Sequence, residues 1–265
     1  MSQPALHVQI QKLAETVGVP LYRKVGRELA LTVEGEKLAA FAREIEERTV
    51  EFLDELATGS SRQRVVLCAG EGAFLYLLGP TIRAFTKKEA TALELMTADV
   101  TGTIDAVRSG TAHIGVLSLE TQPPDLTAEL MTKVPHMIVF PKNHRLSKRR
   151  NLALADLDEE ALIVPPQGRP LRTTIEQRFT EAGSRLRVAV EASGWEVMLH
   201  FVSLGVGAAI VNGCCKLPRG LRGIPLKELP KVRYQILSRR GAPLRHGARV
   251  LRTMLIERRV VKSWE

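Results

Sequence analysis

The cysteines and histidines are the residues of this chain whose types most often catalyse reactions or hold metals. Cys68 lies in an apolar run, whereas Cys214 and Cys215 are adjacent. The six histidines are scattered, without a His-x-x-x-His pair or a helix that adds a glutamate ligand. Three unevenly spaced cysteines make neither a disulfide framework nor a zinc cage. We therefore expect no metal site, and we favour packing over redox sensing for the cysteines.

Motifs for nucleophilic or nucleotide chemistry are missing from the sequence. It contains no Gly-x-Ser-x-Gly elbow and no Gly-rich loop that ends in Lys-Ser or Lys-Thr. The glycines of "GVGAAI" (205–210) lead into a strand-like run rather than out of one, so they do not match a dinucleotide site. Trp195 and His200 stand at helical spacing and are expected in the core or at an interface. We expect a protein that is not an enzyme and has no cofactor.

A polar helix face at the start of the chain is the first candidate binding surface. Ser2 is suited to cap a helix, and Pro4 is suited to its first turn. The apolar residues that follow recur at helical spacing: Leu6, Ile10, Leu13 and Val17. With this stripe turned inward, the outward positions near the helix start are Gln3, Pro4, His7, Val8 and Gln11.

Turn residues and a second helix follow this segment. Gly18 and Pro20 end the first helix, and "RKVGRELAL" predicts a small hairpin about Gly26. Thr32 then caps a helix that runs to about residue 58. Its apolar residues alternate four and three apart, as in a heptad seam: Leu38, Ala42, Ile45, Thr49, Phe52 and Leu56. Such a narrow stripe on a long acidic helix favours a dimerisation arm over a core helix.

The pattern changes after a hinge-like segment, "ATGSSRQR" (57–64). Strand-like runs then alternate with helical patterns in two successive sets, which favours an α/β fold with parallel sheets in two small lobes. We expect a first lobe of about residues 62–162 and 230–265, and a second lobe of about 163–229. The segments before it are expected to form separate parts, at 1–31 and 32–58.

The segment "SQPALHVQIQKLAETVGVPLYRK…RELALTVEGEKL" resembles the end of the winged helix-turn-helix of LysR-type bacterial transcriptional regulators. The α/β region resembles the effector domain of that family, which has two lobes of periplasmic-binding-protein type. This resemblance covers nearly the whole chain. It implies a partial winged helix-turn-helix, a linker helix and a two-lobed effector-binding domain, in a regulator that binds double-stranded operator DNA and assembles as a dimer or tetramer.

The resemblance makes the first helix a recognition helix whose outward residues read bases in the major groove. In the family two helices precede this one, so we expect that Met1 is an internal start or a truncation. Each apolar side chain left exposed would forgo about 1.5 to 3 kcal/mol, so the chain as given should bind its operator poorly. The implied DNA-contacting residues are Ser2, Gln3, Pro4, His7, Val8 and Gln11, with phosphate contacts from Lys12, Arg23, Lys24 and Arg27.

The resemblance also places a small-molecule effector between the lobes, at the carboxyl ends of the strands. The implied contacts come from three loops: Gly70, Glu71 and Gly72; Thr101; and Gln167, Gly168 and Arg169. Helix N-termini with Arg169 or Arg172 would suit an anionic ligand, whereas Glu71 would repel one, so the charge of the effector stays open. The simpler interpretations are a tight turn at Gly70–Gly72 and a surface or interlobe salt bridge at Arg169.

The charge distribution is uneven. The chain has 38 Lys and Arg against 29 Asp and Glu, a net charge of +9, and the excess lies downstream of residue 58. It concentrates in "KNHRLSKRR" (142–150) and in 216–262. A solvated surface is the simpler interpretation of these segments, and an accessory surface that wraps DNA is the more specific one. Because no signal peptide or spanning run is apparent, we expect a cytoplasmic protein that does not enter the membrane. The alternative function is a stand-alone small-molecule sensor of the same fold without DNA binding.

Overall fold

The computed structural model describes residues 3–26, 28–58, 64–89, 91–119 and 121–257. The chain divides into two compact units. The first comprises Met1–Arg64 with Ser109–Thr111, and the second comprises Val65–Arg108 with Ala112–Glu265. No described helix is long and apolar enough to cross a membrane.

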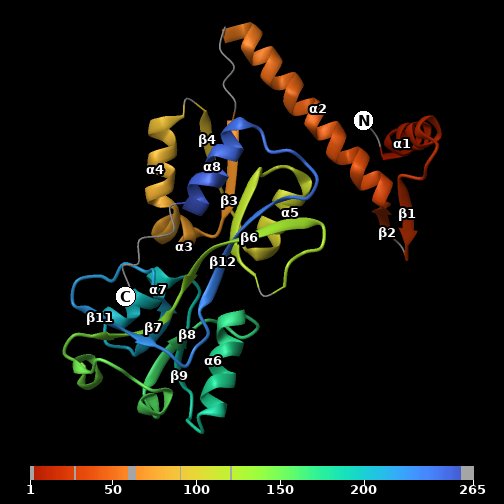
Figure 1. The fold of residues 1–265 in the computed structure, drawn as a ribbon. Coiled ribbons are helices and arrows are strands. Elements are labelled where there is room, and N and C mark those ends of the chain that lie inside the picture. Colours follow the sequence, from red (N-terminus) through yellow and green to blue (C-terminus); the bar gives the residue numbers. More distant parts are fainter. Residues whose placement is uncertain (1–2, 27, 59–63, 90, 120, 258–265) are drawn as a thin grey trace. The chain divides into compact units, whose positions relative to one another are not determined.

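The first unit is a helix, a hairpin and a long helix: α1 (Gln3–Val17), β1 (Tyr22–Val25), β2 (Glu28–Leu31) and α2 (Val33–Thr58) (Figure 1). Gly18 adopts a φ of +74° and donates its N–H to the carbonyl of Ala14, which ends α1 in the expected left-handed cap. Gly26, at a φ of +64°, lies in the turn of the antiparallel hairpin. The expected hairpin about Gly26 is therefore confirmed.

Thr32 joins the hairpin to α2. Its hydroxyl accepts the N–H of Gly35 at 3.0 Å and donates to the carbonyl of Pro20 at 2.6 Å, so the predicted cap is confirmed. At Gly35 an added Cβ would lie 1.9 Å from the carbonyl oxygen of Leu21. Only glycine allows α2 to lie this close to the buried Leu21, and this contact fixes the start of α2 against the hairpin.

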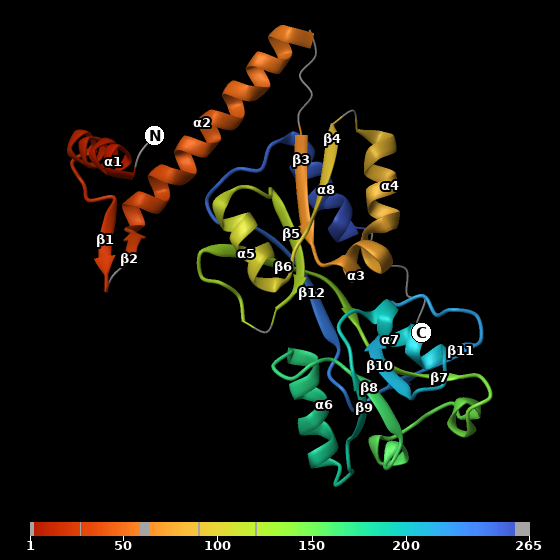
Figure 2. The ribbon, with the colours of Figure 1, turned by 180° about the vertical axis from the view of Figure 1, so that it is seen from behind.

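The second unit contains two five-stranded sheets. The first sheet has the order β4-β3-β5-β12-β6. Its strands are β3 (Arg64–Ala69), β4 (Ala92–Thr97), β5 (Ile114–Ser118), β6 (Leu126–Val134) and β12 (Val232–Arg239). Alternate residues of β3 face opposite sides, and each side is covered by helices (Figure 2). The helices are α3 (Glu71–Ala73), η1 (Phe74–Leu78), α4 (Gly79–Lys88), α5 (Val100–Ser109) and α8 (His246–Glu257).

Leu67 packs with Phe85 and Leu251 on the side of α4 and α8, whereas Val66 and Cys68 pack with Val107 of α5. This period of two explains why the strand reads as a continuous apolar run, since both of its faces are buried.

The second sheet has the order β11-β7-β10-β8-β9. Its strands are β7 (His136–Pro141), β8 (Ala161–Val164), β9 (Arg187–Glu191), β10 (Ala208–Asn212) and β11 (Leu221–Leu226). The helical segments around it are η2 (Arg145–Lys148), η3 (Leu154–Leu157), α6 (Pro170–Glu181) and α7 (Trp195–Ser203). Ile138 and Phe140 pack on the side of α6, and Met137 and Val139 pack on the side of α7.

Two expectations about the sheets were wrong. Both sheets are mixed rather than parallel, because β12 runs antiparallel to β5 and β7 runs antiparallel to β10. The second sheet also begins at His136 rather than at residue 163, since β7 pairs with β10 and β11. The physical reason for both is the same: the chain crosses between the sheets directly from β6 to β7 and returns from β11 to β12, without an intervening helix.

Candidate functional site

The polar face of α1 lies next to the hairpin through one aromatic contact. The rings of His7 and Tyr22 are 5.5 Å apart, and the Tyr22 hydroxyl lies 3.3 Å from Nε2 of His7. The structure thus brings a predicted base-reading residue against β1, which also carries Arg23 and Lys24. Tyr22 was not predicted as part of this surface, although a tyrosine in the first strand of a hairpin is a residue type that can make such a contact.

The other predicted DNA-contacting residues of α1 are exposed where their side chains are described. Val8 is 50% exposed, and Gln11 and Lys12 are exposed as well. Arg23 and Lys24 are exposed on β1. Ser2 and Arg27 lie outside the described residues, and the side chains of Gln3 and Pro4 do so too. A helix face and a neighbouring basic strand therefore form one open surface on this unit.

The apolar stripe of α1 is also open. Leu6, Leu13 and Val17 are between 42% and 45% exposed, and Ile10 is half-buried. None of these four side chains is buried within the described part of the chain. They form an apolar surface on the same small unit that carries the polar face.

The predicted seam of α2 is exposed as well. Ile45 is 49% and Phe52 is 59% exposed, Ala42 is exposed, and Leu38 is half-buried. The side chain of Leu56 lies outside the described residues. Phe41 and Leu53 add two exposed apolar side chains that the heptad pattern did not include. The apolar face of this helix is therefore wider than the sequence indicated.

Two of the predicted effector loops meet at one edge of the first sheet. Gly70, Glu71 and Gly72 follow β3, and Thr101 lies in the first turn of α5, which follows the neighbouring strand β4. The N–H of Ala98 donates to the carbonyl of Ala69, so the two loops are joined directly. The two carboxylates of these loops do not suit an anionic ligand. Glu71 is exposed, and Asp99 caps α5 by accepting the N–H of Gly102 at 2.9 Å.

The third predicted loop follows β8 in the second sheet. Gln167, Gly168 and Arg169 are exposed, and α6 begins after Arg169 without a side-chain cap. Arg172, in contrast, is only 5% exposed. Its guanidinium donates to Glu176 at 2.6 Å, to Glu191 at 2.8 Å and to the carbonyl of Pro165 at 3.1 Å. Of the two arginines considered for an anionic ligand, Arg169 is therefore the accessible one, and Arg172 holds the loop in place.

These loops lie on the edges of the two sheets that meet. Asn212, at the end of β10, donates its amide to the hydroxyl of Tyr234 on β12 at 3.0 Å. Because β8 runs parallel to β9 and β10, the loop after β8 shares this edge. No hydrogen bond or ion pair among the described residues joins Gln167–Arg169 to the loops of the first sheet.

The start of α7 closes part of this junction. An added Cβ at Gly72 would lie 2.2 Å from a ring atom of Trp195. Tyr76 donates its hydroxyl to Glu196 at 2.5 Å, and its ring lies 6.0 Å from that of Trp195. Burial and the neighbouring carboxylate of Glu196 raise the pKa of Tyr76. The interface role expected for Trp195 is confirmed, whereas His200 is exposed and contacts the ring of Phe201.

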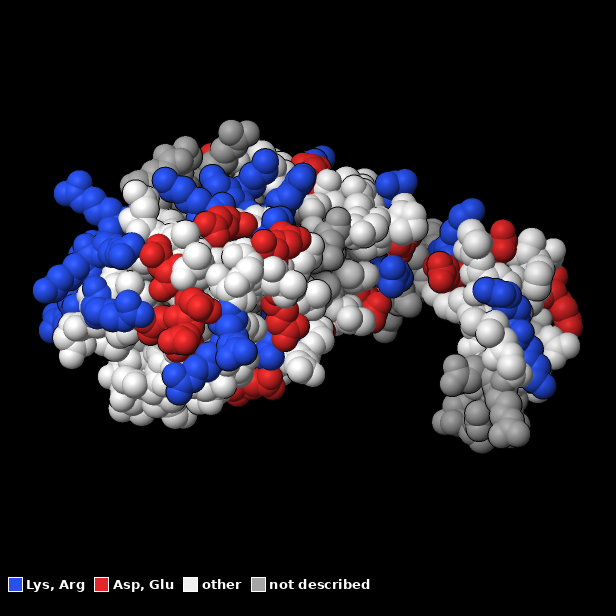
Figure 3. Space-filling view, turned by 90° about the horizontal axis from the view of Figure 1, so that it is seen from below, with Lys and Arg blue, Asp and Glu red and all other residues white. Residues whose placement is uncertain are grey.

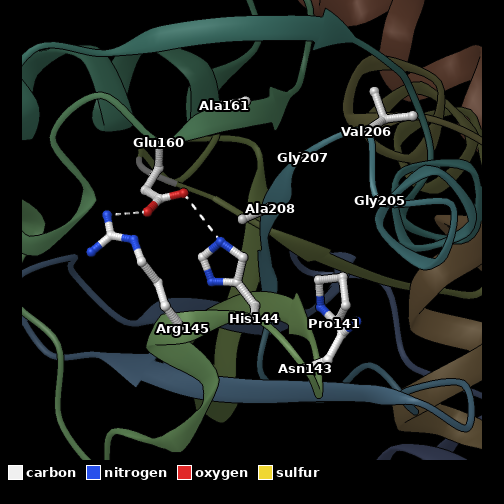
Figure 4. A pocket seen from close by; sticks show the side chains of 10 residues that line it. All are labelled: Pro141, Asn143, His144, Arg145, Glu160, Ala161, Gly205, Val206, Gly207 and Ala208. Carbon is white, nitrogen blue, oxygen red and sulfur yellow. Dashed lines mark hydrogen bonds and ion pairs between the residues drawn. The ribbon is translucent and has the colours of Figure 1, made fainter.

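A hollow of about 520 Å³ lies at the other end of the second sheet (Figure 4). It is lined by Pro141, Asn143, His144, Arg145, Glu160, Ala161, Gly205, Val206, Gly207 and Ala208. Ala161 and Ala208 begin β8 and β10, so the hollow is at the edge opposite to Gln167–Arg169. In it Glu160 pairs with Arg145 and lies 3.3 Å from His144. None of the predicted effector residues lines this hollow.

The cysteines are free and buried. Burial raises the pKa of Cys68, and a hydrogen bond with Cys214 together with burial raises the pKa of Cys215. Raised thiol pKa values lower the thiolate fraction, which disfavours redox reactivity. Among the described residues, no three His, Cys, Asp or Glu side chains gather as they would around a metal ion.

Comparison with known proteins gives three further findings. The regulator CbbR of Xanthobacter flavus is 28% identical over 249 residues, which cover 90% of this chain and 74% of CbbR. The structure of full-length CbnR with its target DNA superposes with a TM-score of 0.66 at 20% identity, covering 98% of this chain and 91% of that one. The effector binding domain of QuiR with shikimate gives a TM-score of 0.63 at 16% identity, covering 74% and 97%.

A sequence model of the LysR substrate binding domain matches residues 58–259, which is most of the chain. The match begins at the end of α2 and includes both five-stranded sheets. The chain therefore belongs to the LysR family of transcriptional regulators.

Proposed function

We propose that this chain regulates transcription by binding operator DNA through the exposed face of α1 and the basic strand β1. The observation that carries the proposal is the order helix, hairpin, long helix, followed by the matched LysR domain. A helix with a polar face fits the major groove, and the hairpin brings Arg23 and Lys24 within reach of phosphates. That CbnR has been solved with its target DNA supports this assignment.

Gln11 is the residue of α1 best placed to read a base. A glutamine can form two hydrogen bonds with an adenine edge, and the side chain of Gln11 is exposed. Gln9 is also an exposed glutamine of α1, but two residues along a helix it lies on nearly the opposite side. The pair therefore offers a matched comparison of the two faces.

We also propose that a small-molecule effector binds where the second unit joins its two sheets. Arg169 and the uncapped start of α6 supply a positive charge and N–H donors, which suit an anionic group. Gly70, Gly72 and Thr101 would contact the rest of the molecule, and exposed Glu71 would reject a ligand with a second anionic group near β3. The effector binding domain of QuiR was solved with shikimate, a small carboxylic acid, which supports a ligand of this chemical class.

The exposed apolar face of α2 supports assembly of the chain into dimers or tetramers. Phe41, Ile45 and Phe52 are large side chains that water disfavours, and a second copy of α2 would cover them. A dimer would present two α1 helices to DNA, which predicts an operator with two related half-sites.

Selection from a library of random duplexes tests the proposal. The 265-residue chain is used at micromolar concentration, because weak operator binding is expected of it, and should enrich a motif with two related half-sites over repeated rounds. Gln11→Ala should relax the preference at one or two positions of each half-site, at a cost of about 1 to 3 kcal/mol in discrimination, whereas Gln9→Ala should leave the motif unchanged. If the unaltered chain enriches no motif, the proposed function is wrong.

A further inference from the structure

Two segments of the second unit carry cations without any acid. Residues 142–150, "KNHRLSKRR", contain five Lys and Arg, and residues 216–222, "KLPRGLR", contain three. The two segments lie about 70 residues apart in the sequence. A joint surface arises only if the fold brings them together.

The fold does bring them together at the β11 edge of the second sheet. Beyond the last pair of β7 and β11, Lys142 donates its N–H to the carbonyl of Gly220 at 2.8 Å. Arg222 is paired with Phe140 across the two strands, and paired residues of antiparallel strands point to the same face. Leu146 of η2 packs in the same core cluster as Phe140, so η2 covers this face next to Arg222.

Only part of this charge is neutralised within the chain. Arg145 pairs with Glu160, and Arg149 pairs with Asp156 at 2.9 Å. The remaining cations of the two segments are exposed, and no ion pair to them occurs among the residues the structure describes. Lys216 follows the buried Cys215 near the His136 end of β7, away from Lys142, so we call the other five the basic face: Lys142, Lys148, Arg150, Arg219 and Arg222. Figure 3 shows Lys and Arg side chains gathered at the left end of the view, where Figure 1 places β11.

The chemistry of the basic face fits a regular polyanion. Single-stranded nucleic acid is held by cations together with aromatic rings on which bases stack. The two segments contain no Phe, Tyr or Trp, and the ring of His144 is occupied by stacking on Phe140 at 4.7 Å. Duplex DNA needs no such platform, because it presents one phosphate charge for about every 1.7 Å of its axis.

We propose that the basic face binds the phosphate backbone of duplex DNA without reading its sequence. Under the proposed function, on which this partner rests, operator DNA is already held by α1 and the hairpin. The basic face would then contact phosphates outside the bases that α1 reads, and so add affinity and bind flanking DNA. Its contribution is sequence-independent, which separates it from the role of Gln11.

Salt dependence measures such contacts. Each phosphate contact adds about 0.9 to the slope of log affinity against log salt concentration. With a random-sequence duplex and the full 265-residue chain, Lys142→Gln/Lys148→Gln/Arg219→Gln/Arg222→Gln should reduce the slope by about 3 to 4. The matched control is Arg83→Gln/Lys87→Gln/Lys88→Gln/Lys133→Gln, which removes four exposed cations of the first sheet and its helix α4. It should leave the slope within about 0.5 of the unaltered chain.

The rate at which individual lysines are acetylated gives a second measurement, which shows where on the chain the duplex binds. Random duplex should slow the acetylation of Lys142 and Lys148 by several-fold, while Lys87 and Lys88 react at their free rates. A slope reduced by at least one relative to the control, with this protection, supports the proposal. Equal slopes for the two variants, or equal protection of all four lysines, would overturn it.

Competition with polyglutamate tests whether the basic face binds an acidic protein instead of DNA. If polyglutamate competes with the duplex at equal charge concentration and protects the same two lysines, the basic face recognises an acidic peptide and the proposal is wrong. A failure of the operator selection leaves these measurements intact, because they use DNA without an operator.

Discussion

The hydroxyl of Tyr76 lies 2.5 Å from Oε1 of Glu196 and joins the helix after β3 to the start of α7. Tyr76 lies in η1, beside the first sheet, and Glu196 lies in α7, beside the second sheet. This hydrogen bond therefore spans the junction where we place the effector. The bond lies next to Trp195, whose ring covers Gly72. A ligand that binds at this junction must either keep these contacts intact or replace them. Substitutions that remove them therefore test the structure of the junction.

Removing this hydrogen bond should weaken the second unit by a measurable amount. We expect Tyr76→Phe and Glu196→Gln to show a coupling free energy of about 0.5 to 1.5 kcal/mol in a double-mutant cycle, because the bond is charged but accessible to water. Urea unfolding of the four proteins gives this value. Tyr76→Phe combined with Glu181→Gln serves as the control and should be additive, since Glu181 bonds with Gln177 and Arg178 on α6 instead.

Gly72 should tolerate no side chain, whereas Gly70 should tolerate one. At Gly72 a Cβ would overlap the Trp195 ring at 2.2 Å, while at Gly70 the nearest atom is the Ala98 carbonyl oxygen at 3.8 Å. Gly72→Ala should therefore displace the indole and cost about 1 to 3 kcal/mol of unfolding free energy, and Gly70→Ala should cost less than about 0.5 kcal/mol. In a Trp264→Phe background, the tryptophan emission of Gly72→Ala should shift to the red. Equal spectra for the two variants would show that the indole does not rest on Gly72.

Arg169 and Arg172 lie three residues apart, but their substitution by alanine should have different effects on stability and on ligand binding. Arg172→Ala leaves the Pro165 carbonyl without its donor and removes a buried side chain, so we expect a loss of about 2 kcal/mol in urea unfolding. Arg169 is exposed, and Arg169→Ala should leave stability within about 0.5 kcal/mol. In thermal-shift measurements with a panel of small carboxylic acids, an acid that stabilises the unaltered chain should not stabilise Arg169→Ala. Retained stabilisation would exclude Arg169 from the effector site.

Much of the fold follows from local pattern. The strands that read as continuous apolar runs, such as Ile114–Ser118 and Ala208–Asn212, are strands because both sheet faces are covered. The N-cap at Thr32 and the turns at Gly18 and Gly26 were predicted correctly, because each depends on residues close in sequence.

What the sequence left unpredicted depends on distant partners. Leu126–Val134 alternates poorly, and Leu221–Leu226 contains glycine and proline, yet both become strands by pairing with β12 and β7. The junction of Gly72, Tyr76 and Glu196 joins segments about 120 residues apart in the sequence, so no local pattern predicts it. The basic character of 142–150 was visible in the sequence, but its contact with 219–222 depends on the pairing of β7 with β11.

Tyr234 should make the stability of the second unit depend on alkaline pH. Burial is the main cause that raises the pKa of this hydroxyl above its ordinary value near 10. The folded chain therefore keeps the proton where the unfolded chain has lost it, so stability is full below about pH 10 and falls above it. Tyr234→Phe should cost about 1 to 2 kcal/mol at pH 7, where Asn212 loses its acceptor. Above pH 10 that difference should shrink by up to about 1.4 kcal/mol per pH unit. A constant difference from pH 7 to 11 would contradict the assignment.

The apolar face of α2 should govern the assembly of the chain. Ile45 and Phe52 are about half exposed within one chain, and burying both in a helix pair would release about 1.5 to 3 kcal/mol for each side chain. Ile45→Ser/Phe52→Ser should therefore lower the mass seen by analytical ultracentrifugation at micromolar concentration, and weaken operator binding because paired half-sites need two copies. Leu75→Ser/Leu204→Ser removes two exposed apolar side chains from the second unit and serves as the matched control. If only this control lowers the mass, the copies meet through the second unit and α2 does not pair.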